Sequence, residues 1–290
     1  MRRSFLLAHL VILLTASLRA QTPDAPQPLR VMSWNVRYNN PRDGFNSWPR
    51  RKDWVAEIIR TRQVDIAGLQ EVLHGQLGDL QKRLPRMQSY GVGRDNGKTR
   101  GEYAPIFFRS DRFQLLDQGT FWLSQTPERV ASRDWDAAAT RIASWVQLQD
   151  RHSDQVFFVV NTHFDHVGRT ARLESARLLV ERLQSKFAQH PVVLTGDFNT
   201  TPESAPYKTL VAAKAYRDAR SLTKEKPVGP NSTWNGFRAI ARNRRIDFVF
   251  VTPGVAVHQH AIIDDQRDGR FPSDHLPVLT QLEFTEASRR

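Results

Sequence analysis

Strand-like apolar runs recur along most of this chain, and helical patterns alternate with several of them. The runs, rich in Val, Ile, Phe and Trp, include residues 29–36, 64–69, 104–108, 142–148, 156–162, 192–195, 246–251 and 278–284. Helical patterns cover 54–61, 76–84 and 171–187. Strands mixed with helices throughout, with no internal repeat or long linker, predict one α/β (α+β) domain whose sheets are covered by helices.

Six short polar clusters stand at or near the ends of these runs. They are residues 33–36, 69–72, 161–166, 195–199, 245–248 and 273–277. Together they supply carboxylates, carboxamides and imidazoles. The chain has no cysteine, which excludes disulfides, zinc–thiolate sites and a lipoprotein-type anchor. This inventory suits a hard divalent cation and hydrolysis of a phosphate ester. Each cluster alone is weak evidence for such a site, but all six clusters in this order predict one.

Two clusters offer an oxygen ligand where a strand ends. Asn35 and Glu71 are the predicted primary metal pair, although a strand-end acid such as Glu71 is often merely solvated. In an extended chain Asp197 and Asn199 would share a face, with Phe198 turned into the core. Asp197 could then deprotonate a water, and Asn199 could hold Asp197 or a phosphate oxygen. An Asx turn ending the strand is the alternative.

Two histidines lie in these clusters. His163 ends one apolar run and His275 follows Asp274, and both could stabilise phosphate oxygens or protonate a leaving group. A nearby carboxylate would raise the basicity of a histidine and fix its tautomer. A hydrogen-bonded structural histidine is the alternative. Asp165 and His166 are expected to fix a loop.

Residues 91–102 and 219–244 are expected to form rim loops, because long polar segments in compact domains are often functional. An aromatic beside arginines suits base stacking with phosphate contacts, or a sugar ring, although the Trp could pack on the core and the arginines could be solvated. The candidate substrate-binding residues are Trp234, Arg238, Arg242 and Arg245. The P-loop, HExxH and GxSxG motifs are absent.

The first 20 residues are typical of a secretory signal, with Arg2 and Arg3 before a short apolar stretch and cleavage expected after Ala20. An uncleaved anchor is the alternative, but the stretch is too short to span a bilayer comfortably. The expected organisation is a signal peptide at 1–20, a flexible segment at 21–28, the domain at 29–284 and a tail at 285–290. We expect a secreted or periplasmic monomer without a stable membrane anchor. The net charge of the full chain is +12, and without residues 1–20 it is +9. This positive charge favours anionic partners.

These motifs resemble those of the endonuclease/exonuclease/phosphatase superfamily over residues 29–284. Their residues are most similar to those of the bacterial branch near the deadenylase-like members. The resemblance implies a DNase I-like four-layer sandwich, with two packed β-sheets and helices on the outer faces. It implies a phosphoesterase dependent on Mg²⁺ or Mn²⁺ with metal ligands Asn35, Glu71 and Asp274. The catalytic residues that it implies are His163, Asp197, Asn199, Asp247 and His275, with Asp247 supporting His275.

The expected function is therefore an exported hydrolase that directs water at phosphorus in line. RNA or DNA is the first expected substrate, because of the basic charge and the deadenylase-like motifs. A sugar phosphatase or a phospholipid head-group phosphodiesterase is the second expectation. A catalytically silent binding module is the alternative from another class, and the complete motifs argue against it.

Overall fold

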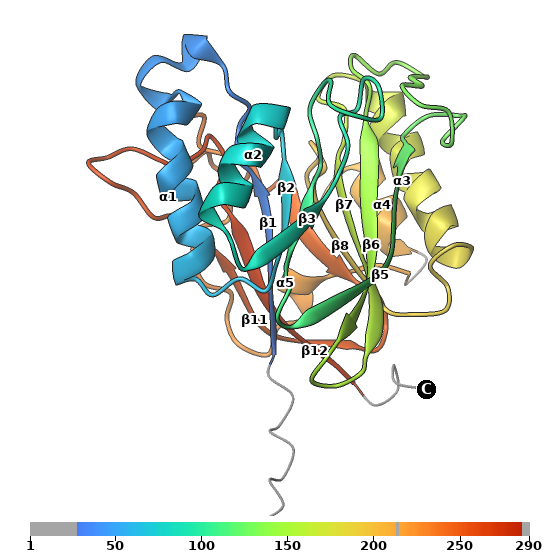
Figure 1. The fold of residues 1–290 in the computed structure, drawn as a ribbon. Coiled ribbons are helices and arrows are strands. Elements are labelled where there is room, and N and C mark those ends of the chain that lie inside the picture. The colour runs from blue at the N-terminus through green and yellow to red at the C-terminus, as the bar shows by residue number, and fades with distance from the viewer. Residues whose placement is uncertain (1–27, 213–214, 286–290) are drawn as a thin grey trace, which may run out of the picture.

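Two six-stranded sheets pack face to face, with helices on both outer faces (Figure 1). The computed structural model describes residues 28–212 and 215–285. The predicted signal peptide, the predicted flexible segment up to residue 27 and the tail from residue 286 lie outside the described residues. The predicted four-layer α/β sandwich is confirmed. Among the described residues, no helix has both the length and the apolar character needed to cross a membrane.

The first sheet has the strand order β11-β12-β1-β2-β4-β3. Its strands β1 and β2 are parallel, and the other pairs are antiparallel. The outer face is covered by α1 (Trp48–Thr61) and α2 (His74–Arg83), and a 3₁₀ helix, η1 (Pro41–Asn46), precedes α1. The strands are β1 (Leu29–Asn35), β2 (Ile66–Gln70), β3 (Met87–Tyr90), β4 (Ile106–Arg109), β11 (Val255–Ile262) and β12 (Val278–Phe284).

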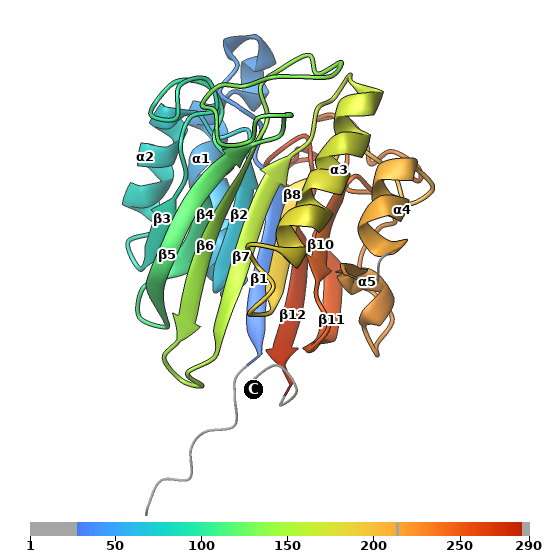
Figure 2. The same ribbon diagram turned by 90° about the vertical axis from the view of Figure 1, so that its right-hand side faces the viewer.

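The second sheet has the order β5-β6-β7-β8-β10-β9, and only β7 and β8 are parallel. Helices α3 (Arg169–Gln184) and α4 (Ala205–Ala212) pack on its outer face (Figure 2), and the short α5 (Ala219–Leu222) follows β9. The strands are β5 (Phe113–Trp122), β6 (Ile142–Asp150), β7 (Val156–His163), β8 (Val192–Asp197), β9 (Arg217–Asp218) and β10 (Asp247–Val251).

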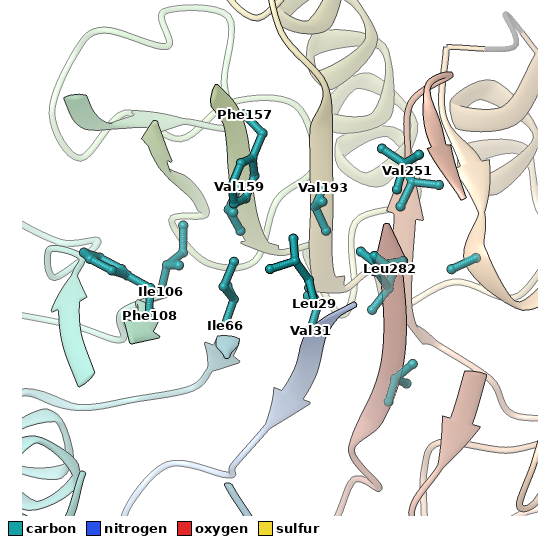
Figure 3. Packing of buried hydrophobic residues seen from close by; sticks show 14 of the residues in the cluster. Leu29, Val31, Ile66, Ile106, Phe108, Phe157, Val159, Val193, Val251 and Leu282 are labelled. Atoms are coloured by element: carbon teal, nitrogen blue, oxygen red, sulfur yellow. The ribbon is translucent and has the colours of Figure 1, made fainter. Parts of the chain in front are cut away.

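The alternation of side chains along each strand divides the apolar residues among three layers of core. In β1, Val31 faces the second sheet, whereas Met32 and Trp34 face α1 and α2. Figure 3 shows the layer between the sheets, where Val31, Ile66, Val159 and Val193 converge from four strands. Both faces of each central strand are therefore buried, which holds the strand ends in fixed positions.

At one end of the sandwich, where β1, β2, β7 and β8 end, the layer between the sheets becomes polar, and we call this end the pole. The Asn161 side chain donates to the Leu69 carbonyl (2.7 Å) and accepts from Gln70 (2.7 Å) and Thr195 (3.0 Å). Gly68 lies opposite, and a Cβ built there would stand 2.0 Å from Thr195 Oγ1. The sheets therefore approach closely at this pole, and the hydrogen bonds of Asn161 connect β7 to β2 and to β8.

Candidate active site

The six polar clusters meet at this pole. Strands β1, β2, β7 and β8 end there, while β10 begins there and residues 273–277 lead into β12. Parallel neighbours bring their carboxyl ends to one edge, and antiparallel neighbours contribute their starts. The topology thus gathers residues that are far apart in the sequence, as the Trp34 indole shows by donating to the His275 carbonyl (3.1 Å).

Asn35 connects two of the predicted carboxylates. Its Nδ2 donates to Glu71 Oε1 (3.1 Å) and to Asp197 Oδ2 (3.0 Å), and its Oδ1 accepts from the Arg37 amide (2.9 Å). Glu71 Oε2 also accepts from the Tyr38 amide (3.1 Å). Glu71 has φ of 60°, an uncommon left-handed conformation for a residue other than glycine. Such conformations concentrate at functional sites, where the surroundings hold them in place.

The third predicted metal ligand lies beside Glu71. The Arg37 guanidinium is 3.9 Å from Glu71 Oε2 and 3.9 Å from Asp274 Oδ2, so one cation faces both carboxylates. Burial raises the pKa of Asp274, and the Glu71 carboxylate adds to the effect. Glu71 and Asp274 supply mutually repelling carboxylates that suit Mg²⁺ or Mn²⁺. The Asn35 carboxamide, whose Nδ2 faces Glu71 here, would add an oxygen ligand with its amide group turned over. The predicted residues therefore fit a divalent cation at Asn35, Glu71 and Asp274.

Asp197, at the end of β8, contacts polar groups from three other segments. Its Oδ2 lies 3.0 Å from Asn35 Nδ2, 3.4 Å from His163 Nε2 and 3.8 Å from His275 Nε2. Burial raises the pKa of Asp197 to about 7, and the Asp247 carboxylate adds to the effect. A carboxylate with a pKa near neutrality suits a general base at neutral pH.

Asn199 does not continue an extended chain beyond Asp197, and of the two alternatives for this segment the structure has the Asx turn. Its φ is 48°, and its amide donates to Asp197 Oδ1 (2.9 Å), which is the Asx-turn alternative. Phe198 is fully buried, as predicted. The Asn199 side chain bonds His163 Nε2 (3.1 Å) and donates to the Phe164 carbonyl (3.1 Å), so it orients the histidine.

The two histidines have opposite electrostatic surroundings. Burial lowers the pKa of His275, but the carboxylates of Asp247 and Asp197 outweigh it and raise that pKa to about 10. Asp247 Oδ2 bonds His275 Nδ1 at 2.9 Å, the placement predicted for a supporting carboxylate. Burial and the guanidinium groups of Arg141 and Arg94 hold the pKa of His163 well below its usual value. The site thus combines an imidazolium at His275 with a neutral imidazole at His163.

Asp197, Asp247 and His275 also stand close enough to hold a metal ion, since one ligand atom from each lies within 4.8 Å of the others. The His275 imidazolium carries a proton on both ring nitrogens, so it offers no lone pair to a metal in this protonation state. The charge balance within this group is therefore supplied by His275.

Sequence reasoning missed several polar groups on the flank of His163. Arg141 directly precedes β6, and Arg94 and Glu102 lie in the predicted rim segment 91–102. Arg141 adjoins an apolar run, and a polar residue beside such a run is the same pattern that identifies the other clusters. Asp165 accepts from the amides of Val167 (2.9 Å) and Gly168 (2.7 Å), as expected of a loop-fixing residue.

The second predicted rim loop forms hydrogen bonds with the backbone of the site. Asn235 donates from its amide to the Asp274 carbonyl (2.8 Å) and from its side chain to the Ser273 carbonyl (3.0 Å). These bonds fix the backbone that carries Asp274 and His275. Asn235 is a positioning residue that the sequence did not single out.

The four candidate substrate-binding residues are not all directed at the site. Arg245 forms an ion pair with Asp218 (2.7 Å) and lies over the Phe248 ring, so its substrate role is withdrawn. Trp234 is half-buried, and the Arg244 guanidinium stacks on its ring at 4.0 Å. Arg238 and Arg242 are exposed, which leaves their predicted role open to test.

Residues 32–275 match the Endonuclease/Exonuclease/phosphatase family. An endonuclease/exonuclease/phosphatase from Bacteroides vulgatus superposes with a TM-score of 0.86 at 41% identity, covering 89% of this chain and 100% of that one. A mannosyl-6-phosphatase from Bacteroides thetaiotaomicron superposes with a TM-score of 0.83 at 35% identity, covering 88% and 100%. Human nocturnin is 24% identical over 311 residues, which cover 93% of this chain and 69% of nocturnin.

Proposed function

Because the chain belongs to the endonuclease/exonuclease/phosphatase family, we propose that it is a divalent-metal-dependent phosphomonoesterase acting on a small phosphorylated molecule. The observation that carries the proposal is the position of Asp197, whose Oδ2 lies 3.0 Å from Asn35, 3.4 Å from His163 and 3.8 Å from His275. One carboxylate thereby contacts Asn35 of the predicted metal pair and both imidazoles. The name of the mannosyl-6-phosphatase, 35% identical to this chain, supports a phosphomonoester over a polymer.

A cation held by Asn35, Glu71 and Asp274, either Mg²⁺ or Mn²⁺, would supply Lewis-acid neutralisation of the phosphate. Asp197 orients a water and accepts its proton, which its pKa of about 7 allows at neutral pH. The His275 imidazolium faces the same carboxylate and is placed to stabilise negative charge on the phosphate oxygens. Asp247 keeps that imidazole protonated and oriented.

The test is release of inorganic phosphate by the purified protein without residues 1–20. A panel of sugar phosphates and phenyl phosphate, with Mg²⁺ or Mn²⁺ and with EDTA, gives the decisive comparison. We expect turnover that requires the metal and a KM that changes little with salt. Hydrolysis of none of the monoesters under any metal condition would discard the proposal.

A nucleic-acid phosphodiesterase is the second candidate, favoured by the match to nocturnin and the net charge of +12. Its signature is a steep loss of affinity with salt, because each phosphate contact releases counterions. If an oligonucleotide is the better substrate, Arg238→Ala with Arg242→Ala should flatten that slope. Trp234→Ala should lower affinity at every salt concentration.

We also propose that the protein is exported through the signal at residues 1–20. The basic start and short apolar stretch support this proposal. Expression of the full chain in a bacterial host, followed by fractionation and intact mass measurement, tests it. Uncleaved protein retained in the cytoplasm would contradict export.

A further inference from the structure

A small recess opens beside His163. Its polar lining consists of Arg94, Glu102, Arg141 and His163, with Tyr103, Ala104 and Ile142 completing the wall. Its volume of about 10 Å³ matches the space that one water or one hydroxyl group occupies. A group the size of one water therefore fits in the recess.

Three buried nitrogen atoms of this lining have no hydrogen-bond partner among the described residues. They are Arg94 Nε, Arg141 Nη1 and His163 Nδ1. Arg141 is only 4% exposed, and its other nitrogens already contact Asp165 (3.4 Å) and His166 (2.9 Å). A buried donor without a partner is destabilising, so such a cluster indicates a missing oxygen atom.

The recess also contains an acceptor. Glu102 pairs with Arg94 at 2.6 Å, and its Oε2 lies 3.8 Å from His163 Nδ1. A hydroxyl group both accepts from guanidinium N–H groups and donates to a carboxylate. A phosphate oxygen can only accept and would be repelled by the Glu102 carboxylate. The donor and acceptor pattern therefore suits a hydroxyl group, as it suits a water, and disfavours a phosphate oxygen.

The two edges of the His163 ring face different parts of the site. Nε2 lies 3.4 Å from Asp197 Oδ2, where the phosphate must react, and Nδ1 faces the recess. A group bound in the recess is thus one imidazole ring away from the reaction centre. This separation suits a hydroxyl and a phosphate carried by the same small molecule.

We propose that the recess binds one hydroxyl group of the substrate's alcohol part, and that Glu102, Arg94 and Arg141 select a polyhydroxylated monoester such as a sugar phosphate. This inference rests on the proposed phosphomonoesterase function and narrows its substrate class. The three residues are specificity-determining and take no part in bond breaking.

The experiment measures kcat/KM for a hexose 6-phosphate, its monodeoxy derivatives and phenyl phosphate. With the wild-type protein, one deoxy derivative should react about tenfold or more slowly than the parent, because it leaves charged groups unpaired. In Glu102→Gln the kcat/KM for the parent sugar phosphate should fall toward the value for that deoxy derivative. The ratio of the two kcat/KM values should shrink to about threefold or less. Arg94→Lys should have the same effect. Glu225→Gln, at an exposed position, is the matched control and should leave the ratio unchanged.

The outcomes separate this inference from the proposed function. If the wild-type protein hydrolyses the monoesters but no deoxy derivative reacts more slowly, the recess does not bind a hydroxyl. If Glu102→Gln lowered kcat/KM equally for the parent and for every deoxy derivative, the inference would also be overturned. The residue would then act on catalysis in general. Failure of the wild-type protein to hydrolyse any monoester overturns the proposed function itself, and the inference with it.

Discussion

The close approach of the two sheets at Gly68 leads to a prediction about stability and activity together. In Gly68→Ala the new Cβ would stand 2.0 Å from Thr195 Oγ1 and 2.7 Å from Asn161 Oδ1, if nothing moved. The first distance is about 1.4 Å inside ordinary van der Waals contact. Either the sheets must separate locally, or Thr195 must rotate and lose its hydrogen bond to Asn161.

Both responses are costly. Overpacking a core costs about 1–3 kcal/mol, and a buried hydroxyl left unpaired costs about 1–3 kcal/mol. We therefore expect Gly68→Ala to lower the free energy of unfolding by about 1–3 kcal/mol, a sizeable part of the about 5–15 kcal/mol typical of a domain. Because β2 and β8 lead directly to Glu71 and Asp197, a displacement of about 1 Å should also lower kcat about 10²-fold.

Urea denaturation followed by tryptophan fluorescence measures the change in stability, and phosphate release measures kcat. Gly78→Ala is the matched control, because Gly78 lies within α2 and a Cβ added there would meet nothing within 4 Å. That substitution should stabilise the protein by about 0.5–1 kcal/mol. If Gly68→Ala unfolded at the wild-type urea concentration, the argument for close sheet contact would be wrong.

Three further predictions follow from the site and the core. Glu71→Gln should raise the metal concentration needed for half-maximal phosphate release at least tenfold without changing the thermal midpoint, and unchanged metal dependence would exclude Glu71 as a ligand. His275→Ala should lower kcat by about 10² or more, whereas full activity in that variant would remove the imidazolium from the mechanism. Burial lowers the pKa of His260 to about 4, so the unfolded chain binds a proton near pH 6.5 that the folded chain does not. Stability should therefore fall by about 3 kcal/mol as the pH drops from 7 to 4, and His260→Gln should remove that part of the loss in urea titrations at each pH.

The sequence predicted the central strands of both sheets and missed the edges. Each of the eight apolar runs is a strand, whereas β3, β5, β9 and β11 stand at the ends of the strand orders. An edge strand is covered on fewer sides, and β5 accordingly exposes Gln114 and Asp117. Such a strand lacks the continuous apolar run that identifies a central strand, so its sequence resembles that of a loop.

The site was predictable where a functional side chain follows a buried strand. Asn35, Asp197 and His163 satisfy that rule, and the parallel pairs bring them together. Asn199 departed from the expected extended geometry because an Asx turn begins at Asp197. Arg245 was misread because the partner that engages it, Asp218, comes from another strand, and the sequence contains no signal for that pair.

The most direct test of the proposed mechanism is the kcat of Asp197→Asn with Mg²⁺ or Mn²⁺ on the best monoester substrate. The substitution keeps the shape of the side chain and removes the carboxylate that contacts Asn35, His163 and His275. Asp165→Asn is the matched control, because Asp165 is also buried but bonds loop amides and Arg141. We predict a loss in kcat of about 10²-fold or more for Asp197→Asn, with a smaller loss for Asp165→Asn. A near-normal kcat in Asp197→Asn, with the fold intact, would contradict the assignment of this pole as the catalytic site.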